Sequence, residues 1–558
     1  MVAAQCSMFT DDTDSEDDLP LNIVKNGLRL RELFEDSSDG SDFEGFEPEN
    51  YSSSSDDSDD ASDSEADENF WKTEASSMDT DKEVRWRSIS LPENVNNSDR
   101  QRFQVRNPGP RNLPPQNSTP IHYFYLFFNV ELFTLIIRET NRYARSILTQ
   151  LTDWVREHVH SHYRRWVPVT VAEMKKYIGL CINMGLIKKK MSDYWSKRYS
   201  SQDTPFFRRI MSKNRFFLIS RMFHLNDNDN RRQRGDENFD PWHKVRPVMD
   251  HLNTKFKHHY IPSRDLSIDE SMIGMKNRHA YIQYVPNKRH NRFGIKKFEV
   301  CEAKTGYVLH TELYSGRDFD VRSPDGQGSA VVMYLMQVCD LLRKGYHLIT
   351  DNFYTKLKLV EDLLHLGTFM TGTVRNNSRG FPRALIEIRL YVGETRYMRK
   401  GDILALAFRD KKSQRKPVLL LSSTCAAVDH PHQRKNGEQC IRPEMIKAYN
   451  AGMGGVDLMD RKIYQIAAER PTHRYWVKVF ANLLDMSLRN AYELYLQNTD
   501  GRKLSRQNFV AEIVEELCGN TQADDQIAND APLPAHRLCF LVSGKERNCV
   551  VCSTKENR

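Results

Sequence analysis

Three aspartates occupy positions from which their side chains could bind divalent metal ions together. Asp269 and Asp351 each end an apolar stretch that reads as a buried strand, and Asp457 follows a glycine pair and enters a helix. Sites in open α/β sheets are assembled at the carboxyl ends of strands. Carboxylate oxygens are the ligands that Mg²⁺ prefers. Asp460, three residues after Asp457, falls on the same helical face and is a candidate fourth ligand.

The chemistry of such a cluster would be phosphoryl transfer. Two Mg²⁺ (or Mn²⁺) ions about 4 Å apart activate a water or a 3′-hydroxyl and stabilise the leaving oxygen of an in-line displacement. Residue type alone leaves an alternative open, because aspartates at strand ends also cap helices and form turns.

Basic residues crowd the segment after Asp269. Lys288, Arg289, Arg292, Lys296 and Lys297 are the candidates for contacts with DNA phosphates. The alternative is a solvated hairpin edge that is protected by charge.

The elements around the aspartates alternate in character. Apolar spacing of three to four residues predicts helices over 121–150, 170–187, 204–224, 442–464 and 474–498. Between them, 293–302 and 307–315 read as a hairpin, and strands are expected at 266–269, 346–350 and 368–374, with helices over 330–343 and 355–366. These patterns predict an α/β core between helical flanks.

Charge is distributed unevenly along the 558 residues. Residues 1–70 carry 22 acidic and three basic side chains, a net charge of −19, so the whole-chain charge of +6 leaves +25 for the remainder. A basic body favours a polyanionic partner, although solvated basic faces would give the same count. The runs of Ser, Asp and Glu predict disorder and sites for an acidophilic kinase.

The cysteine pattern and the expected absence of a signal peptide predict the cellular compartment. The ten cysteines are mostly scattered, which favours a reducing compartment over a disulfide scaffold. The start of the sequence lacks a basic segment before an apolar one, so no signal peptide is expected. The most apolar stretch, 121–137, is too short and too interrupted to span a bilayer. No membrane association is therefore expected.

Three sequence blocks resemble the piggyBac transposase family. They are SIDESM at 267–272 with YVPNK at 284–288 and RFGIK at 292–296, LITDNFYT at 348–355, and YNAGMGGVDLMD at 449–460. The blocks occur in the family's order, and the similarity runs from about 120 to 500, including ETNRY at 139–143 and KVRP at 244–247.

The resemblance implies an RNase H-like catalytic core, a mixed sheet flanked by helices, with a β-rich insertion and a discontinuous all-α domain for dimerisation and DNA binding. It implies cut-and-paste transposition, in which a nick at the transposon end is followed by hairpin formation and joining at TTAA targets. By position, Asp269, Asp351 and Asp457 would be the catalytic, metal-binding triad and Asp460 a supporting carboxylate. A homodimer that binds double-stranded DNA in the nucleus is expected.

The expected domains follow from the composition and the resemblance together. They are an acidic, serine-rich disordered region (1–118), a first helical part (119–263), a first catalytic part (264–376), a β-rich insertion (377–438), a last catalytic part (439–462), a second helical part (463–530) and a short cysteine-rich tail (531–558).

The tail departs from the family, whose members usually end in several CxxC pairs that bind two zinc ions. His536, Cys539, Cys549 and Cys552 could form one small zinc knuckle, since a structural site needs four ligands. The alternative is a truncated module in which Cys539 is an unrelated core residue.

Three functions remain open at this point. The first is a transposase, or a transposase-derived protein, with an intact catalytic centre. The second is a domesticated DNA-binding or chromatin-associated protein that keeps the fold and no longer transposes, which the short tail favours. The third is a metal-dependent nuclease that does not join targets.

Overall fold

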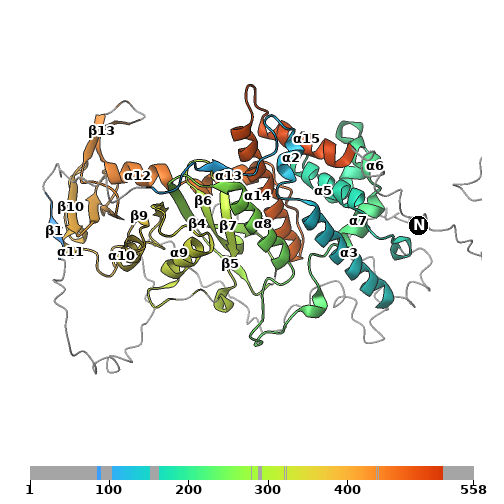
Figure 1. Ribbon diagram of the computed structural model, residues 1–558, viewed down its shortest axis with the longest axis horizontal. Coiled ribbons are helices and arrows are strands. Elements are labelled where there is room, and N and C mark those ends of the chain that lie inside the picture. The colour runs from blue at the N-terminus through green and yellow to red at the C-terminus, as the bar shows by residue number, and fades with distance from the viewer. Residues whose placement is uncertain are drawn as a thin grey trace, which may run out of the picture.

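The computed structural model describes residues 85–89, 103–150, 162–277, 279–286, 292–319, 321, 323–434, 437 and 439–519. In Figure 1 the molecule is elongated, with a strand-rich end on the left, a sheet flanked by helices in the centre and a helical end on the right. No helix in these ranges combines the length and the apolar composition needed to cross a membrane. The six cysteines that the structure describes are free thiols.

Ten of the described strands form one mixed sheet. Its order is β1-β10-β11-β12-β9-β8-β4-β6-β5, and β7 also pairs with β6. The bounds are β1 (Arg87–Ser88), β4 (Asp265–Gly274), β5 (Ile282–Tyr284), β6 (Phe293–Glu302), β7 (Val308–Leu313), β8 (His347–Thr350), β9 (Phe369–Thr373), β10 (Thr395–Lys400), β11 (Ile403–Phe408) and β12 (Val418–Ser422).

The centre of this sheet is the part that carries the aspartates. β7, β6 and β4 are antiparallel neighbours, and β8 and β9 follow on the other side of β4 in parallel. Numbered along the chain, these five strands stand in the order 3-2-1-4-5, the mixed sheet expected for an RNase H-like core. The predicted α/β class is confirmed.

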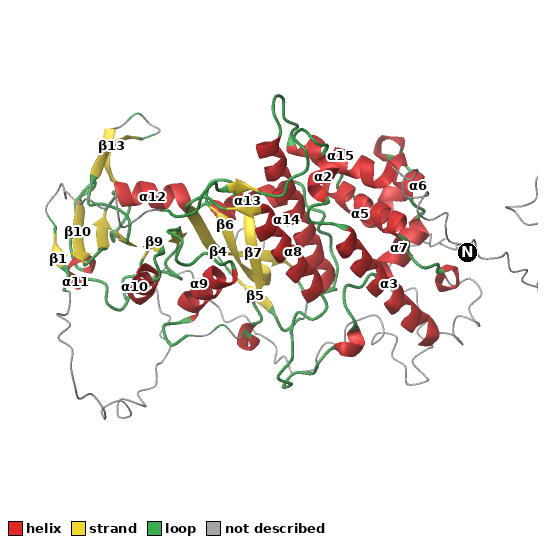
Figure 2. Cartoon of the chain, viewed as in Figure 1, coloured by secondary structure: helices red, strands yellow, loops and turns green. Residues whose placement is uncertain are grey.

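Helices cover both sides of the central strands (Figure 2). The helix α13 packs on β4 and β6, while α9 contacts β6 and α10 contacts β9. The bounds in this region are α8 (Arg246–His259), α9 (Gln327–Val338), α10 (Leu357–His365), α11 (Arg383–Ile386), α12 (Glu444–Gly452) and α13 (Gly455–Gln465).

The helical end is built from segments on both sides of the sheet in sequence. Its members are α2 (Pro120–Phe124), α3 (Val130–Gln150), α5 (Val171–Leu186), α6 (Pro205–Ile210), α7 (Lys213–Met222), α14 (Tyr475–Asn498) and α15 (Arg506–Gly519). The late helix α15 packs against the early helices α5 and α2. A Cβ on Gly179 of α5 would lie 2.7 Å from Cys518 Sγ of α15, so only glycine permits this approach. The helical part is discontinuous, as expected.

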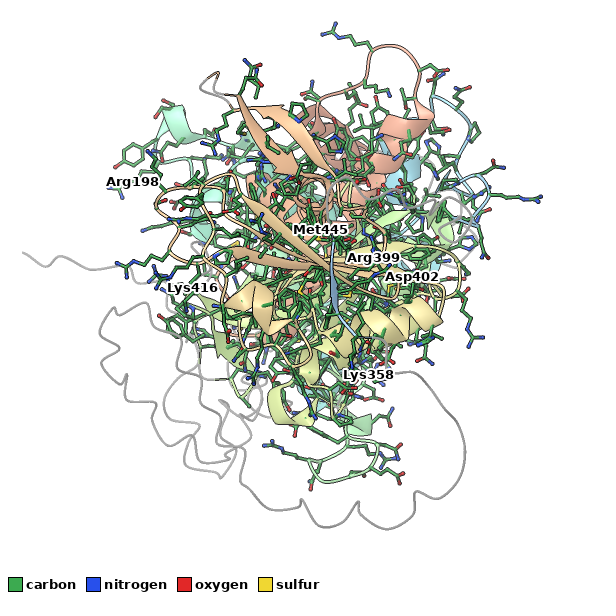
Figure 3. The ribbon with its side chains drawn as sticks, turned by 90° about the vertical axis from the view of Figure 1, so that its left-hand side faces the viewer. Arg198, Lys358, Arg399, Asp402, Lys416 and Met445 are labelled. Carbon is green, nitrogen blue, oxygen red and sulfur yellow. The ribbon has the colours of Figure 1, made fainter. Side chains whose placement is uncertain are left out.

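The strand-rich end contains the strands expected between 377 and 437. Strands β10 to β12 extend the main sheet beyond β9, and β13 (Asp429–Gln433) pairs with β14 (Gln439–Pro443) in a hairpin that projects from it. Met445 of α12 packs with Tyr397 and Leu406 in a small second core. In the β10–β11 turn, Arg399 Nη1 donates to the Asp402 carbonyl at 3.3 Å (Figure 3). A further short pair joins β2 (Gly109–Pro110) to β3 (Tyr260–Ile261).

Three local expectations need correction, the first of which is the helix expected over 121–150, because the structure divides it into α2 and α3. The strand expected to end at Asp269 continues to Gly274, because its later half pairs with β6. The helix expected over 204–224 is broken at Met211 into α6 and α7, and Ser212 caps the second helix by accepting from Arg215 N. At the start of α5, Thr170 Oγ1 accepts from Glu173 N at 3.2 Å, and the Glu173 carboxylate binds Arg215.

Asp485 of α14 gives the fold a pH dependence. It is 1% exposed, and both carboxylate oxygens accept from Ala468 N, at 3.0 and 3.2 Å. Burial raises the pKa of Asp485 well above its ordinary value, and the Glu469 charge adds to this. The folded state therefore retains a proton that the unfolded state releases above a pH of about 4. Stability is full below that pH and is lost as the pH rises toward the folded pKa.

We therefore expect Asp485→Asn to remove this loss of stability at higher pH. Between pH 5 and 8 the variant should gain up to about 1.4 kcal/mol of unfolding free energy per pH unit relative to the parent, until the folded pKa is passed. Urea unfolding of both chains at pH 5, 6.5 and 8 measures the difference. A constant difference across that range would contradict the raised pKa.

Candidate active site

The strand register places Asp269 and Asp351 side by side. Asp265 to Ser267 of β4 pair in parallel with His347 to Ile349 of β8, position for position. Asp269 lies two residues further along β4, and Asp351 directly follows Thr350, the last residue of β8. Neighbouring strands lie about 4.8 Å apart. Asp269 and Asp351 therefore both lie near the carboxyl end of β8.

A compact turn fixes Asp351. Its Oδ1 accepts from Phe353 N at 2.9 Å, and its carbonyl accepts from Thr355 N at 3.1 Å and from Thr355 Oγ1 at 2.7 Å. The turn rests against β9, where a Cβ on Gly372 would stand 2.1 Å from Thr355 Oγ1. Asp351 thus makes the contacts of a turn-forming aspartate, which was the alternative to a metal ligand. Its second carboxylate oxygen is still available for other partners.

The start of α13 brings Asp457 to the same part of the sheet. Asp457 is exposed in the first turn of α13, where the helix dipole favours a negative charge. The neighbouring Gly455 lies so close to β4 that a Cβ there would be 2.9 Å from Ser267 Cβ. Ser267 Oγ also donates to the Met453 carbonyl at 3.1 Å. Gly455 is therefore the residue that lets the start of α13 approach β4 closely.

Tyr449 of α12 marks the place where the three aspartates meet. Burial raises the pKa of Tyr449, and the charges of Asp351, Asp269 and Asp457 raise it further. Each of the three is thus near enough to this hydroxyl to act on it. Sequence reasoning assigned no role to Tyr449, although it begins the third block.

Asp460 of α13 is half-buried. Burial raises the pKa of Cys301 on β6 well above its ordinary value, and the charges of Asp460 and Asp269 contribute. Both aspartates are therefore near enough to Cys301 to act on it.

Two glutamates that the sequence did not single out add to the negative charge. Burial raises the pKa of Asp351, and the charge of Glu270 raises it further. Glu270 accepts from Tyr354 Oη at 3.0 Å. Glu299, directly opposite Asp269 on β6, is fully buried, and its Oε2 has no hydrogen-bond partner among the described residues.

The donor set fits hard divalent cations in its chemistry and its place. The candidate ligands are carboxylate oxygens, and the cluster has an excess of negative charge that a cation would offset. Within the described ranges, however, no three His, Cys, Asp or Glu side chains are arranged closely enough to hold an ion as they stand. The carboxylates are gathered in one region and are not preassembled as a ligand set.

The structure places the basic candidate residues in different environments. Lys297 is 1% exposed and its Nζ lies 2.5 Å from Glu299 Oε1, so burial corrects the expectation that it contacts DNA. Lys296 points to the other face, where its Nζ lies 4.9 Å from the ring centres of Phe298 and Phe353. Arg292 is exposed and stays a candidate.

Several predicted site residues fall outside the part of the chain that the structure describes. They are Lys288, Arg289, His536, Cys539, Cys549 and Cys552.

Trp476 of α14 packs in the interior. Its ring is 2% exposed, and Lys244 Nζ lies 4.1 Å from its centre.

Comparisons with known proteins agree with this geometry. A family model described as transposase IS4 matches residues 119–492. The piggyBac transposable element-derived protein 3 of Homo sapiens is 26% identical over 395 residues, which cover 68% of this chain and 61% of that protein. The piggyBac transposable element-derived protein 5 of Homo sapiens is 22% identical over 431 residues, which cover 74% and 78%.

The fold is also similar to a solved structure. A chain of the cryo-EM structure of the piggyBac transposase synaptic complex with hairpin DNA matches with a TM-score of 0.64 at 22% identity. The match covers 81% of this chain and 95% of that one. This likeness to the solved structure concerns the fold. The chain spans 61% of the length of the first human relative, which is less than two thirds.

Proposed function

This chain belongs to the transposase IS4 family, among its piggyBac-type members, and we propose that it cuts and joins DNA strands by metal-dependent phosphoryl transfer. Asp269, Asp351 and Asp457 are the proposed catalytic carboxylates, with Asp460 in support. The observation that supports the proposal is the parallel pairing of β4 with β8, because Asp269 and Asp351 follow the paired residues and both influence Tyr449 together with Asp457.

The chain's own residues would hold and orient the reacting groups. Two Mg²⁺ or Mn²⁺ ions, when bound, would supply an activated hydroxyl and stabilise charge on the leaving oxygen. The Asp351 turn keeps one carboxylate oxygen on Phe353 N and leaves the other for a ligand. The first turn of α13 presents Asp457, whose side chain is exposed.

The wider proposal concerns partners and place. We propose double-stranded DNA with TTAA targets as the substrate, a homodimer as the working form and the nucleus as the compartment. The solved relative is a transposase–DNA synaptic complex, and residues beyond the acidic N-terminal stretch carry a large positive excess. Phosphorylation of the serine-rich N-terminus and zinc binding by His536, Cys539, Cys549 and Cys552 also stay proposals.

A strand-joining assay tests the function. The full chain is incubated with a DNA duplex that ends in a recessed 3′-hydroxyl and with a supercoiled plasmid, in Mg²⁺ or Mn²⁺. We expect nicked plasmid and covalent joints, with sequenced junctions at TTAA, and neither product in EDTA.

A second candidate is a DNA-binding protein that no longer transposes, which the absence of a ready ligand set among the described carboxylates favours. Tight DNA binding without nicks or joints in either metal would select it. Nicks without joints would select a nuclease.

A further inference from the structure

A cluster of positive side chains lies at the contacts of α14 with α13 and with α15. It consists of Arg461 and Lys462 of α13, Arg489 of α14 and Arg506, the first residue of α15. Arg489 forms its base and is 1% exposed, Lys462 and Arg506 are half-buried, and Arg461 is exposed at the rim. The cluster thus extends from the surface into the interior.

The guanidinium groups in this cluster include buried N–H donors that have no hydrogen-bond partner among the described residues. Arg489 Nη2 donates to the Thr305 carbonyl at 2.8 Å and to Glu493 Oε2 at 2.9 Å, but its Nε and Nη1 are buried without a partner among the described residues. Arg506 Nη1 donates to the Lys462 carbonyl, and its buried Nε likewise has no such partner. Buried polar groups are nearly always hydrogen-bonded, and charged donors left unpaired are the most costly.

The cluster also has more positive than negative charge. Burial lowers the pKa of Arg506 to about 10, and the charge of Arg489 lowers it further. Lys462 lies beside this pair, because its carbonyl accepts from Arg506 Nη1. On the negative side, Glu493 is bonded to Arg489, and the raised pKa of the nearby Asp485 weakens it as a counter-charge. The three cations destabilise one another in the absence of an anion.

We propose that Lys462, Arg489 and Arg506 form a binding site for a phosphate group, and that its ligand is a phosphodiester of the DNA strand held at the aspartates. Arginine forks suit phosphate oxygens, and lysine adds a compact charge. The DNA assignment rests on the proposed function and on α13, which carries both Asp457 and Lys462. Five residues of helix separate them by about 7.5 Å along the axis of α13 and by about 140° around it, and each nucleotide advances its strand by about 3.4 Å along the helix axis of the duplex. A phosphate at the cluster would thus lie a few nucleotides from the cleaved bond.

Charge-removing variants test the site without any catalysis. Binding of the full chain to a fluorescent DNA duplex is measured in EDTA across a series of salt concentrations. We expect Arg506→Gln and Lys462→Gln each to weaken binding roughly tenfold and to reduce the slope of log Kd against log salt by about 1. Arg502→Gln is the matched control, because Arg502 is exposed four residues before Arg506, outside the cluster.

A thermal melt separates the two sources of phosphate. Inorganic phosphate, compared with chloride at equal ionic strength, should raise the Tm of the parent and not that of Arg506→Gln or Lys462→Gln. If phosphate acts in this way while the salt slopes of both variants match the parent, the ligand is a free anion and the DNA assignment is overturned. If neither readout changes in either folded variant, the site itself is overturned.

The same thermal melts distinguish an anion-binding role of Arg506 and Lys462 from a purely structural role. Without an anion, removal of a repelled cation should leave the Tm unchanged or raised, whereas a structural arginine would lower it. If Arg506→Gln has a lower Tm than the parent, both the salt slope of DNA binding and the Tm shift in phosphate are judged from Lys462→Gln. Because binding is measured without metal, a chain that binds through the cluster but never cuts DNA would contradict the proposed function alone.

Discussion

Asp351→Asn is expected to abolish strand cutting while leaving the fold and DNA binding intact. The asparagine Oδ1 can still accept from Phe353 N, so the turn after β8 should persist. What is lost is one negative charge beside Asp269 and Glu270. Loss of a carboxylate ligand removes several kcal/mol of charge stabilisation, so we expect the rate of nicking to fall by roughly 10³-fold or more.

The rate is measured as the initial conversion of supercoiled to nicked plasmid in Mn²⁺, beside DNA binding in EDTA. Asp362→Asn on α10 serves as the matched control, since it removes the same charge at a partly exposed position where, among the described residues, Asp362 forms an ion pair with Lys358. Asp457→Asn should match Asp351→Asn, and the double variant should be no slower than either, because ligands of one site act as a unit. Parental nicking by Asp351→Asn would remove Asp351 from the mechanism.

The sequence predicted the aspartates because strands and helix starts carry local signals. An apolar run before Asp351 and a glycine pair before Asp457 are visible in the chain, and their positions match the structure. Asp269 was placed at a strand end, and the structure places it mid-strand. The parallel pairing with β8 stops after Ser267, so the site lies where β8 ends and β4 continues.

The basic candidates show where sequence reasoning stops. Adjacent residues on a strand face opposite sides, so Lys296 and Lys297 could not both face DNA. β6 pairs on both edges and is covered on both faces, so nothing in its sequence says which face a lysine enters. The buried partner, Glu299, is two residues away and was not recognised as one. Tyr449 and Arg489 were missed for a related reason, because their contacts come from distant elements.

Lys297→Met is expected to be the most destabilising single change of a charged side chain in the core. It leaves Glu299, which is fully buried and already has one unpartnered oxygen, without its only described cation. Removing one partner of a buried ion pair typically costs about 3–5 kcal/mol of unfolding free energy. Urea unfolding monitored by tryptophan fluorescence measures it, or loss of soluble protein if the chain no longer folds.

Two further variants make the argument specific to the pair. Lys297→Met with Glu299→Leu should recover most of the stability, because an apolar pair of similar volume can replace a buried ion pair at little cost. The folded double variant should keep the parental salt dependence of DNA binding, since Lys297 does not reach the surface. Lys296→Met removes a half-exposed cation from aromatic rings and should cost about 1 kcal/mol. A Lys297→Met chain as stable as the parent but with a weaker salt dependence would instead make Lys297 a DNA contact and require β6 to open when DNA binds.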